Sequence, residues 1–153
     1  MKTTLNNWLK EEKLKPHKSS KEEINQLFKI VERDLKDANV PDLSSDRKFI
    51  TAYNAALQLT TIVLRIHGFR TNPNKAGHHR ISIDALPEIL GKDFQNITDY
   101  LHACRIKRNI SDYTNSGEIS DADALEIIKE THSLKIAIVK WIKKNFPLFS
   151  PKD

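Results

Sequence analysis

The chain has 153 residues, of which 39% are hydrophobic, and its formal net charge is +5. This length and composition are typical of one domain with an ordinary core, so we expect a single domain spanning residues 1–153. No run of about 20 uncharged apolar residues occurs, which argues against a membrane span. The first ten residues lack the apolar centre of a signal peptide. These features predict a cytoplasmic protein.

The cysteine and histidine content argues against a disulfide and against a zinc site. Cys104 is the only cysteine, and the six histidines do not have the spacing of structural zinc ligands. We therefore expect no metal and no cofactor. Because Cys104 falls on the apolar side of its predicted helix, a buried, unreactive thiol is the favoured interpretation.

Basic residues gather in two segments of the chain. The first segment contains no acidic residue, and its basic residues are Arg70, Lys75, His78, His79 and Arg80. The second contains four basic side chains within seven positions, those of His102, Arg105, Lys107 and Arg108. Such patches are typical of proteins with an acidic partner such as RNA. The alternative is that both are solvated surface charges.

Helical signals dominate the first third of the chain. A short amphipathic helix is expected around Trp8, and Pro16 ends it. Ser20 followed by Glu23 forms a capping-box pattern, and apolar residues then recur at helical spacing to about Asp37.

The most apolar predicted helix begins after Ser44 or Ser45 and ends at Gly68. It contains three small residues that would let a neighbouring helix approach closely: Ala52, Ala55 and Ala56. We therefore place this helix at the centre of the fold. Residues 69–80, rich in Asn, Pro, Gly and basic residues, are predicted to be a loop.

The second half of the chain predicts three further helices. A short one covers residues 81–90, with Pro87 in its first turn or at a kink, and Gly91 ends it. A long helix begins near Asp93 and breaks at residues 116–117. The last begins at Ser120, which with Asp123 reads as a cap, and ends before residue 147. No convincing alternating strand occurs, so we predict an all-α fold, an antiparallel four-helix up-and-down bundle with additional short helices.

The helix that begins near Asp93 contains the most informative segment, residues 104–113. At about 100° per residue, its apolar side continues into two charged residues; the series is Phe94, Ile97, Leu101, Cys104, Arg108 and Asp112. A guanidinium in an inward position needs a partner, because burying it alone costs several kcal/mol. Either Asp112 pairs with Arg108, or this end of the helix opens onto a cleft or a subunit interface. An adjoining strip of the same helix adds His102, Arg105, Asn109 and Tyr113.

A purely structural interpretation of this segment is also open. Arg108 and Asp112 would form an i, i+4 ion pair, Asn109 would help to end the helix, and Tyr113 would pack its ring with the hydroxyl in water. The concentration of Arg, Lys and Asn beyond an apolar stripe favours a functional site instead.

At these residues the sequence resembles the HEPN superfamily (higher eukaryotes and prokaryotes nucleotide-binding), whose members are helical bundles. The signature of that family is an Arg, usually followed by an Asn, then four to six further residues and then a His. Arg108 and Asn109 match its opening, at the end of a long helix, and a Ser-capped final helix follows. The resemblance implies a homodimer that binds RNA or a nucleotide. In active members two such motifs meet across the dimer and cut RNA without metal, the Arg binding phosphate and the His acting at the 2′-hydroxyl.

The chain departs from that signature because no histidine follows Arg108 until His132. Asp112 or Tyr113 stands in the place of the family's histidine, and neither ordinarily titrates near pH 7. His102 from the same helix, or His78 or His79 from the basic loop, are the candidate replacements. The resemblance also implies a nucleotidyltransferase antitoxin as a partner that would modify Tyr113.

Three hypotheses follow. The first is a dimeric HEPN-like module that binds RNA or nucleotide with weak or no catalysis. The candidate catalytic residues of this site are Arg108, Asn109, Tyr113 and His102. The candidate binding residues are Arg105, Lys107, Arg108, Asp112, His78, His79 and Arg80. The second is a metal-independent endoribonuclease, the toxin of a toxin-antitoxin pair. The third is a structural protein-protein interaction module whose polar helix end forms the dimer.

Overall fold

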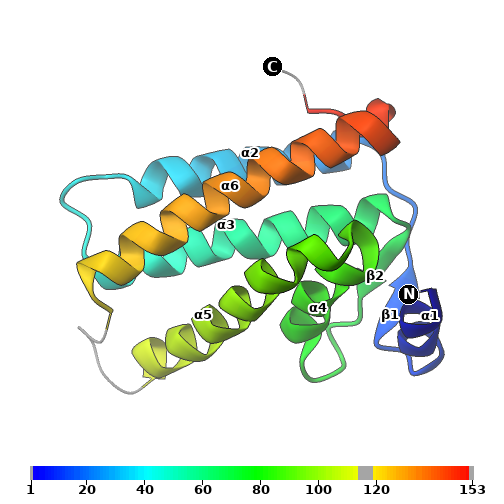
Figure 1. The fold of residues 1–153 in the computed structure, drawn as a ribbon, viewed down its shortest axis with the longest axis horizontal. Helices are drawn as coiled ribbons and strands as arrows, with labels where there is room; N and C mark the ends of the chain where they lie inside the picture. Colours follow the sequence, from blue (N-terminus) through cyan, green and yellow to red (C-terminus); the bar gives the residue numbers. More distant parts are fainter. Residues whose placement is uncertain (1, 114–118, 152–153) are drawn as a thin grey trace.

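A computed structural model describes residues 2–113 and 119–151, and the side chains of residues 4–109 and 119–151. The fold is all-α, as predicted (Figure 1). Its helices are α1 (Lys2–Lys10), α2 (Lys21–Ala38), α3 (Ser45–Ile66), α4 (His78–Leu90), α5 (Gln95–Tyr113) and α6 (Asp121–Asn145), with 3-10 turns η1 (Lys92–Phe94) and η2 (Pro147–Phe149).

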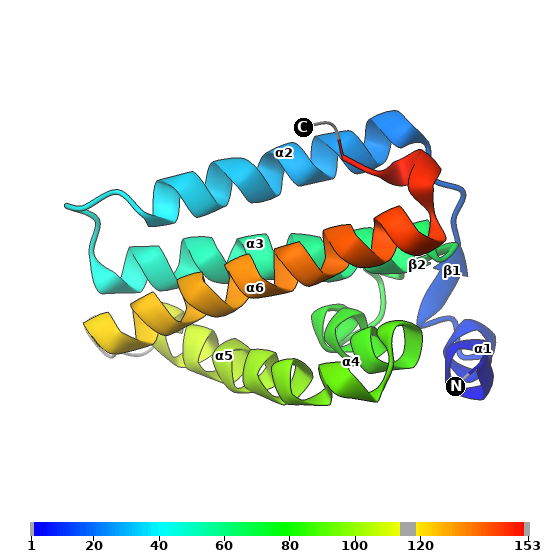
Figure 2. The same cartoon turned by 45° about the horizontal axis from the view of Figure 1, so that its top comes forward.

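Helix α3 lies at the centre of the molecule and packs against α2, α4, α5 and α6. Chain direction alternates along the sequence: α2 and α5 run one way, and α3 and α6 run the other (Figures 1 and 2). The small residues expected to permit close packing, Ala52, Ala55 and Ala56, are all buried. Among the described helices, α3 is long and apolar enough to cross a membrane, and 61% of that stretch is buried inside the molecule.

Serine caps begin the three helices that pack together at the core. Ser20, Ser44 and Ser120 each accept a hydrogen bond from a backbone N–H three residues later, at 3.1, 3.2 and 3.0 Å. At Ser120 the capping box is complete, because Asp123 accepts from the serine N–H. At Ser20 the helix start is confirmed, but the Glu23 side chain instead binds His17 and Arg65.

The prediction that the chain lacks strands was wrong. Strands β1 (Leu14–Pro16) and β2 (Phe69–Thr71) form a short antiparallel sheet, with Leu14 opposite Thr71 and Pro16 opposite Phe69. Gly68, with φ of +100°, ends α3 and turns the chain into β2. Three-residue strands are too short to show alternation, and their partner lies more than fifty positions away.

The predicted loop 69–80 is also shorter than expected, since α4 begins at His78 rather than Ile81. Its N-cap is Gly77, in the left-handed region with φ of +78° and without a side chain to cap the helix, so the usual polar signal is missing. Pro87 lies in the last third of α4 and not in its first turn, and Gly91 ends the helix as predicted. The break predicted at residues 116–117 lies outside the described residues.

Candidate functional site

A pocket of about 190 Å³ lies where the start of α4 faces the second half of α5. The residues around it come from α3, α4 and α5 and from the N-cap of α4: Tyr53, Gly77, His78, His79, Arg80, Arg105, Arg108 and Asn109. The structure therefore brings together members of the two basic segments that are more than twenty residues apart in the sequence. We call this the cationic pocket.

Three guanidinium groups line the cationic pocket, and no carboxylate among the described residues does. Arg108 and Asn109 follow Arg105 by three and four residues, so both lie next to it on one side of α5. The Nε of Arg105 is buried and has no hydrogen-bond partner in residues 4–109 and 119–151. Buried donors of this kind are costly unless they are satisfied, so the arrangement favours an anion in the pocket.

Arg108 lies on the inward side of α5, as its place in the apolar series predicts. The guanidinium carbon lies 5.8 Å from the centroid of the Tyr53 ring, within the range of a cation–π contact. The half-buried side chain lines the pocket rather than extending into bulk solvent.

Tyr53, on α3, is only 1% exposed, and its hydroxyl is buried without a hydrogen-bond partner in the described part of the chain. Burial raises the pKa of Tyr53 to about 12, although the positive charges of Arg105 and Arg108 act in the opposite direction. The hydroxyl therefore keeps its proton at neutral pH and can donate it to an anionic oxygen. Sequence reasoning missed Tyr53, which sits among the apolar residues of a core helix.

The two histidines at the start of α4 complete the pocket. Their rings are in an edge-to-face arrangement, with centroids 4.3 Å apart. Burial lowers the pKa of His79, and the charges of His78, Arg108 and Arg105 lower it further. His79 is thus mostly neutral at pH 7, with one ring nitrogen able to donate and the other able to accept.

The N-terminus of α4 adds partial positive charge to the same place. Gly77, the N-cap, lines the pocket and offers no side-chain acceptor to the amides of the first turn. Free amides and the helix dipole make such a terminus favourable for an anion. It acts here together with the arginines of α5.

Other predicted residues lie elsewhere. The Nε2 of His102 is 2.6 Å from Oδ1 of Asp84, which joins α5 to α4 beside the pocket without lining it. Nζ of Lys107 is 3.2 Å from Oδ1 of Asp123 on α6, on another face of α5. Arg70 lies on β2. The side chains of Asp112 and Tyr113 lie outside the described residues.

Cys104 is buried, and burial raises the pKa of its thiol to about 11. The thiol is therefore protonated at neutral pH, as expected of an unreactive core cysteine. In the described ranges, no group of three or more His, Cys, Asp or Glu side chains could hold a metal ion.

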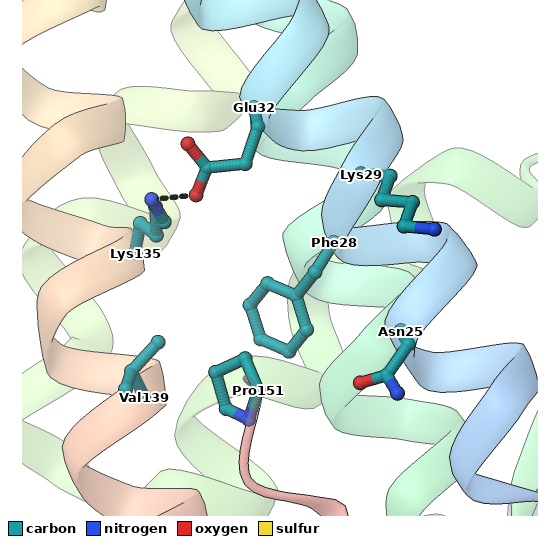
Figure 3. Close-up of a pocket in the computed structure, with 7 residues that line it drawn as sticks. All are labelled: Asn25, Phe28, Lys29, Glu32, Lys135, Val139 and Pro151. Atoms are coloured by element: carbon teal, nitrogen blue, oxygen red, sulfur yellow. Dashed lines mark hydrogen bonds and ion pairs between the residues drawn. The ribbon is translucent and has the colours of Figure 1, made fainter. Parts of the chain in front are cut away.

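A larger cavity, about 540 Å³, lies between α2 and α6 (Figure 3). Phe28, Val139 and Pro151 give it an apolar wall, and Lys135 forms an ion pair with Glu32 across one end. Its residues include none of the predicted site residues, and its charges are already paired or exposed. The concentration of unsatisfied donors lies in the smaller, cationic pocket.

The geometry thus assembles three arginines, two histidines, an asparagine, a buried phenol and a helix N-terminus around one small volume. Such a set can bind a phosphate group through charge-assisted hydrogen bonds. Comparisons of this chain with protein-family models, with curated proteins and with solved structures find no match.

Proposed function

We propose that this protein is an RNA- or nucleotide-binding module that holds a phosphate group in the cationic pocket. The observation that supports this most strongly is the pocket's charge: Arg80, Arg105 and Arg108 line one volume with no carboxylate among the described residues. Guanidinium groups are preferred for phosphate because their planar donors match its oxygens in pairs.

The resemblance to the HEPN superfamily supports the same function. In that family the arginine that corresponds to Arg108 binds phosphate, and Arg108 lines the cationic pocket here with Asn109 beside it. As part of the proposal, two copies of the chain pair so that two such pockets face one RNA. Because the histidine of the family signature is missing after Asn109, catalysis is weak or absent in this proposal.

Fluorescence anisotropy with a short labelled single-stranded RNA tests the proposal. Arg108→Ala is expected to weaken binding roughly ten- to a hundredfold, since it removes a hydrogen bond to a charged group. Lys143→Ala, at the exposed far end of α6, removes the same charge away from the pocket and should leave affinity nearly unchanged. Circular dichroism verifies that both variants fold. Equal affinities of wild type and Arg108→Ala, with the fold intact, would exclude this pocket as the binding site.

A metal-independent endoribonuclease is the second candidate function, and the position of His79 favours it. This mostly neutral histidine lines the pocket beside two arginines, so it could take a proton from a ribose hydroxyl. It would replace, from α4, the histidine absent from the signature on α5. His102 is less suited because Asp84 already binds it.

Incubation of purified protein with RNA in EDTA separates the two candidates. An enzyme would cleave the RNA, and both His79→Ala and Arg108→Ala would abolish the cleavage while His132→Ala, on α6, would not. A binding module would retain RNA without cutting it. Cleavage that survives His79→Ala would refute the role given to His79.

A further inference from the structure

A second pocket, about 400 Å³, shares two lining residues, His78 and His79, with the cationic pocket. Its walls come from α2, α3, β2 and the start of α4: Ile30, Arg33, Asp34, Asn54, Leu57, Gln58, Thr61, Thr71, His78, His79 and Ser82. Since His78 and His79 line both pockets, the two volumes lie close together at the start of α4. We call this second volume the polar pocket.

Two amide side chains face the polar pocket from α3. Asn54 and Gln58 are four residues apart, so they stand one turn apart on the same face of the helix. Neither amide has a hydrogen-bond partner within the described residues, whereas the Thr61 hydroxyl already donates to the Leu57 carbonyl at 3.1 Å. A free amide offers both a donor and an acceptor, the combination that reads the edge of a nucleobase.

The charges of the two pockets differ in a way that orients a ligand. In the polar pocket the only carboxylate among described residues, that of Asp34, is paired with Arg33, whose Nε and Nη2 both lie 3.1 Å from Oδ1. The net charge there is close to zero, and Asp34 would repel an anion. A phosphate therefore favours the cationic pocket, and a neutral, hydrogen-bonding group favours the polar one.

We infer that the polar pocket holds the ribose and base of a nucleotide whose phosphate occupies the cationic pocket. Asn54 and Gln58 bind the edge of the base, and the rings of His78 and His79, which line both volumes, contact its flat face or the sugar. The volume lies within the range of sites for small organic ligands. This inference rests on the proposed function and deepens it, because it names the ligand class as a nucleoside phosphate.

Isothermal titration with separate probes tests the inference. AMP, GMP, CMP and UMP are each compared with inorganic phosphate and ribose 5-phosphate on wild type, on Asn54→Ala/Gln58→Ala, on Arg105→Ala and on Asn6→Ala. Asn6 is an exposed amide on α1 and serves as the matched control. Neither Asn54 nor Gln58 makes a hydrogen bond within the described residues, so their double variant should melt close to the wild-type temperature.

At least one nucleoside monophosphate is expected to bind wild type tighter than inorganic phosphate. Asn54→Ala/Gln58→Ala should weaken that nucleotide by about tenfold and leave inorganic phosphate unchanged. Arg105→Ala should weaken both ligands. If the double variant binds the nucleotide like wild type while Arg105→Ala binds it less well, the base site is refuted and the phosphate site stands. If Arg105→Ala changes nothing, the cationic pocket itself is refuted.

A single-stranded RNA octamer added to the same series distinguishes the source of the nucleotide. If the natural ligand is RNA, the octamer binds more tightly than any monophosphate, and the double variant weakens both in the same direction. If the ligand is a free nucleotide, a terminal phosphate is required and the octamer without one binds no better than ribose 5-phosphate. An octamer that binds tightly but is insensitive to the double variant would refute base contact.

Discussion

The salt dependence of RNA binding gives a quantitative test of the cationic pocket. Three guanidinium groups line it, and if each neutralises one phosphate of a single strand, log K falls against log salt with a slope near −2. Arg105→Ala removes one contact and should reduce the slope to about −1.4. Between about 50 and 200 mM salt, wild type then loses roughly eighteenfold in affinity and the variant roughly sevenfold.

Anisotropy titrations of labelled RNA at several salt concentrations measure both slopes directly. Lys143→Ala is the charge-matched control and should keep the wild-type slope, because Lys143 is in the last turn of α6, and α6 contributes no described residue to the lining of the pocket. Equal slopes for wild type and Arg105→Ala would show that the Arg105 guanidinium makes no phosphate contact. A slope reduced as much by Lys143→Ala would point to diffuse attraction by the net charge of +5.

Three further predictions concern His79, Cys104 and Ser120. The RNA-free fold lowers the pKa of His79 below its ordinary value of 6.5, so the free energy of unfolding, measured by urea melts, should fall as pH drops below about 6.5. RNA affinity, measured by anisotropy, should rise over the same range, because a phosphodiester favours the charged ring. An affinity that does not depend on pH, or whose pH dependence is unchanged by His79→Ala, contradicts the prediction on RNA affinity. The Cys104 thiol, with a pKa of about 11, should react with a thiol reagent at pH 8 only slowly until urea unfolds the chain; rapid reaction of the folded protein would count against its burial. Ser120→Ala should lower the free energy of unfolding by about 1 kcal/mol, read from the urea midpoint, because it removes the side-chain oxygen that accepts from the Asp123 N–H. No change would mean that water replaces this hydrogen bond at no cost.

The long helices were predictable because their signals are local. A short window of sequence contains each signal: a serine followed three residues later by an acidic residue, apolar residues at helical spacing, and Gly68 or Gly91 after the last turn. The two short strands were not predictable, because each is stabilised by a partner far along the chain. The start of α4 was missed for a different reason: its N-cap is a glycine without a capping side chain.

The site was predictable in composition but only partly in arrangement. The periodicity of α5 indicated that Arg108 lies inward and that Arg105 and Asn109 lie beside it, and all three line the cationic pocket. The sequence could not show that His79 from a separate basic segment would face them, since that depends on how α4 packs on α5. Tyr53 was missed because a tyrosine within an apolar helix reads as an ordinary core residue.

Lys107 and His102 show the limit of grouping charges by sequence alone. Lys107 is one residue from Arg108 and therefore about 100° away around the helix, where it meets Asp123. His102 lies one turn before Arg105 on α5, but Asp84 of α4 binds its ring. Basic residues that are close in sequence thus have different partners, and only those facing the start of α4 share the pocket.

A nuclear magnetic resonance titration of the isotope-labelled protein with single-stranded RNA tests the central claim most directly. The account predicts that the largest shifts fall on the backbone amides of residues 77–80 and on the Nε–H groups of Arg105 and Arg108. Shifts confined to the exposed lysines of α6, with these amides and guanidinium groups unmoved at saturation, would contradict it.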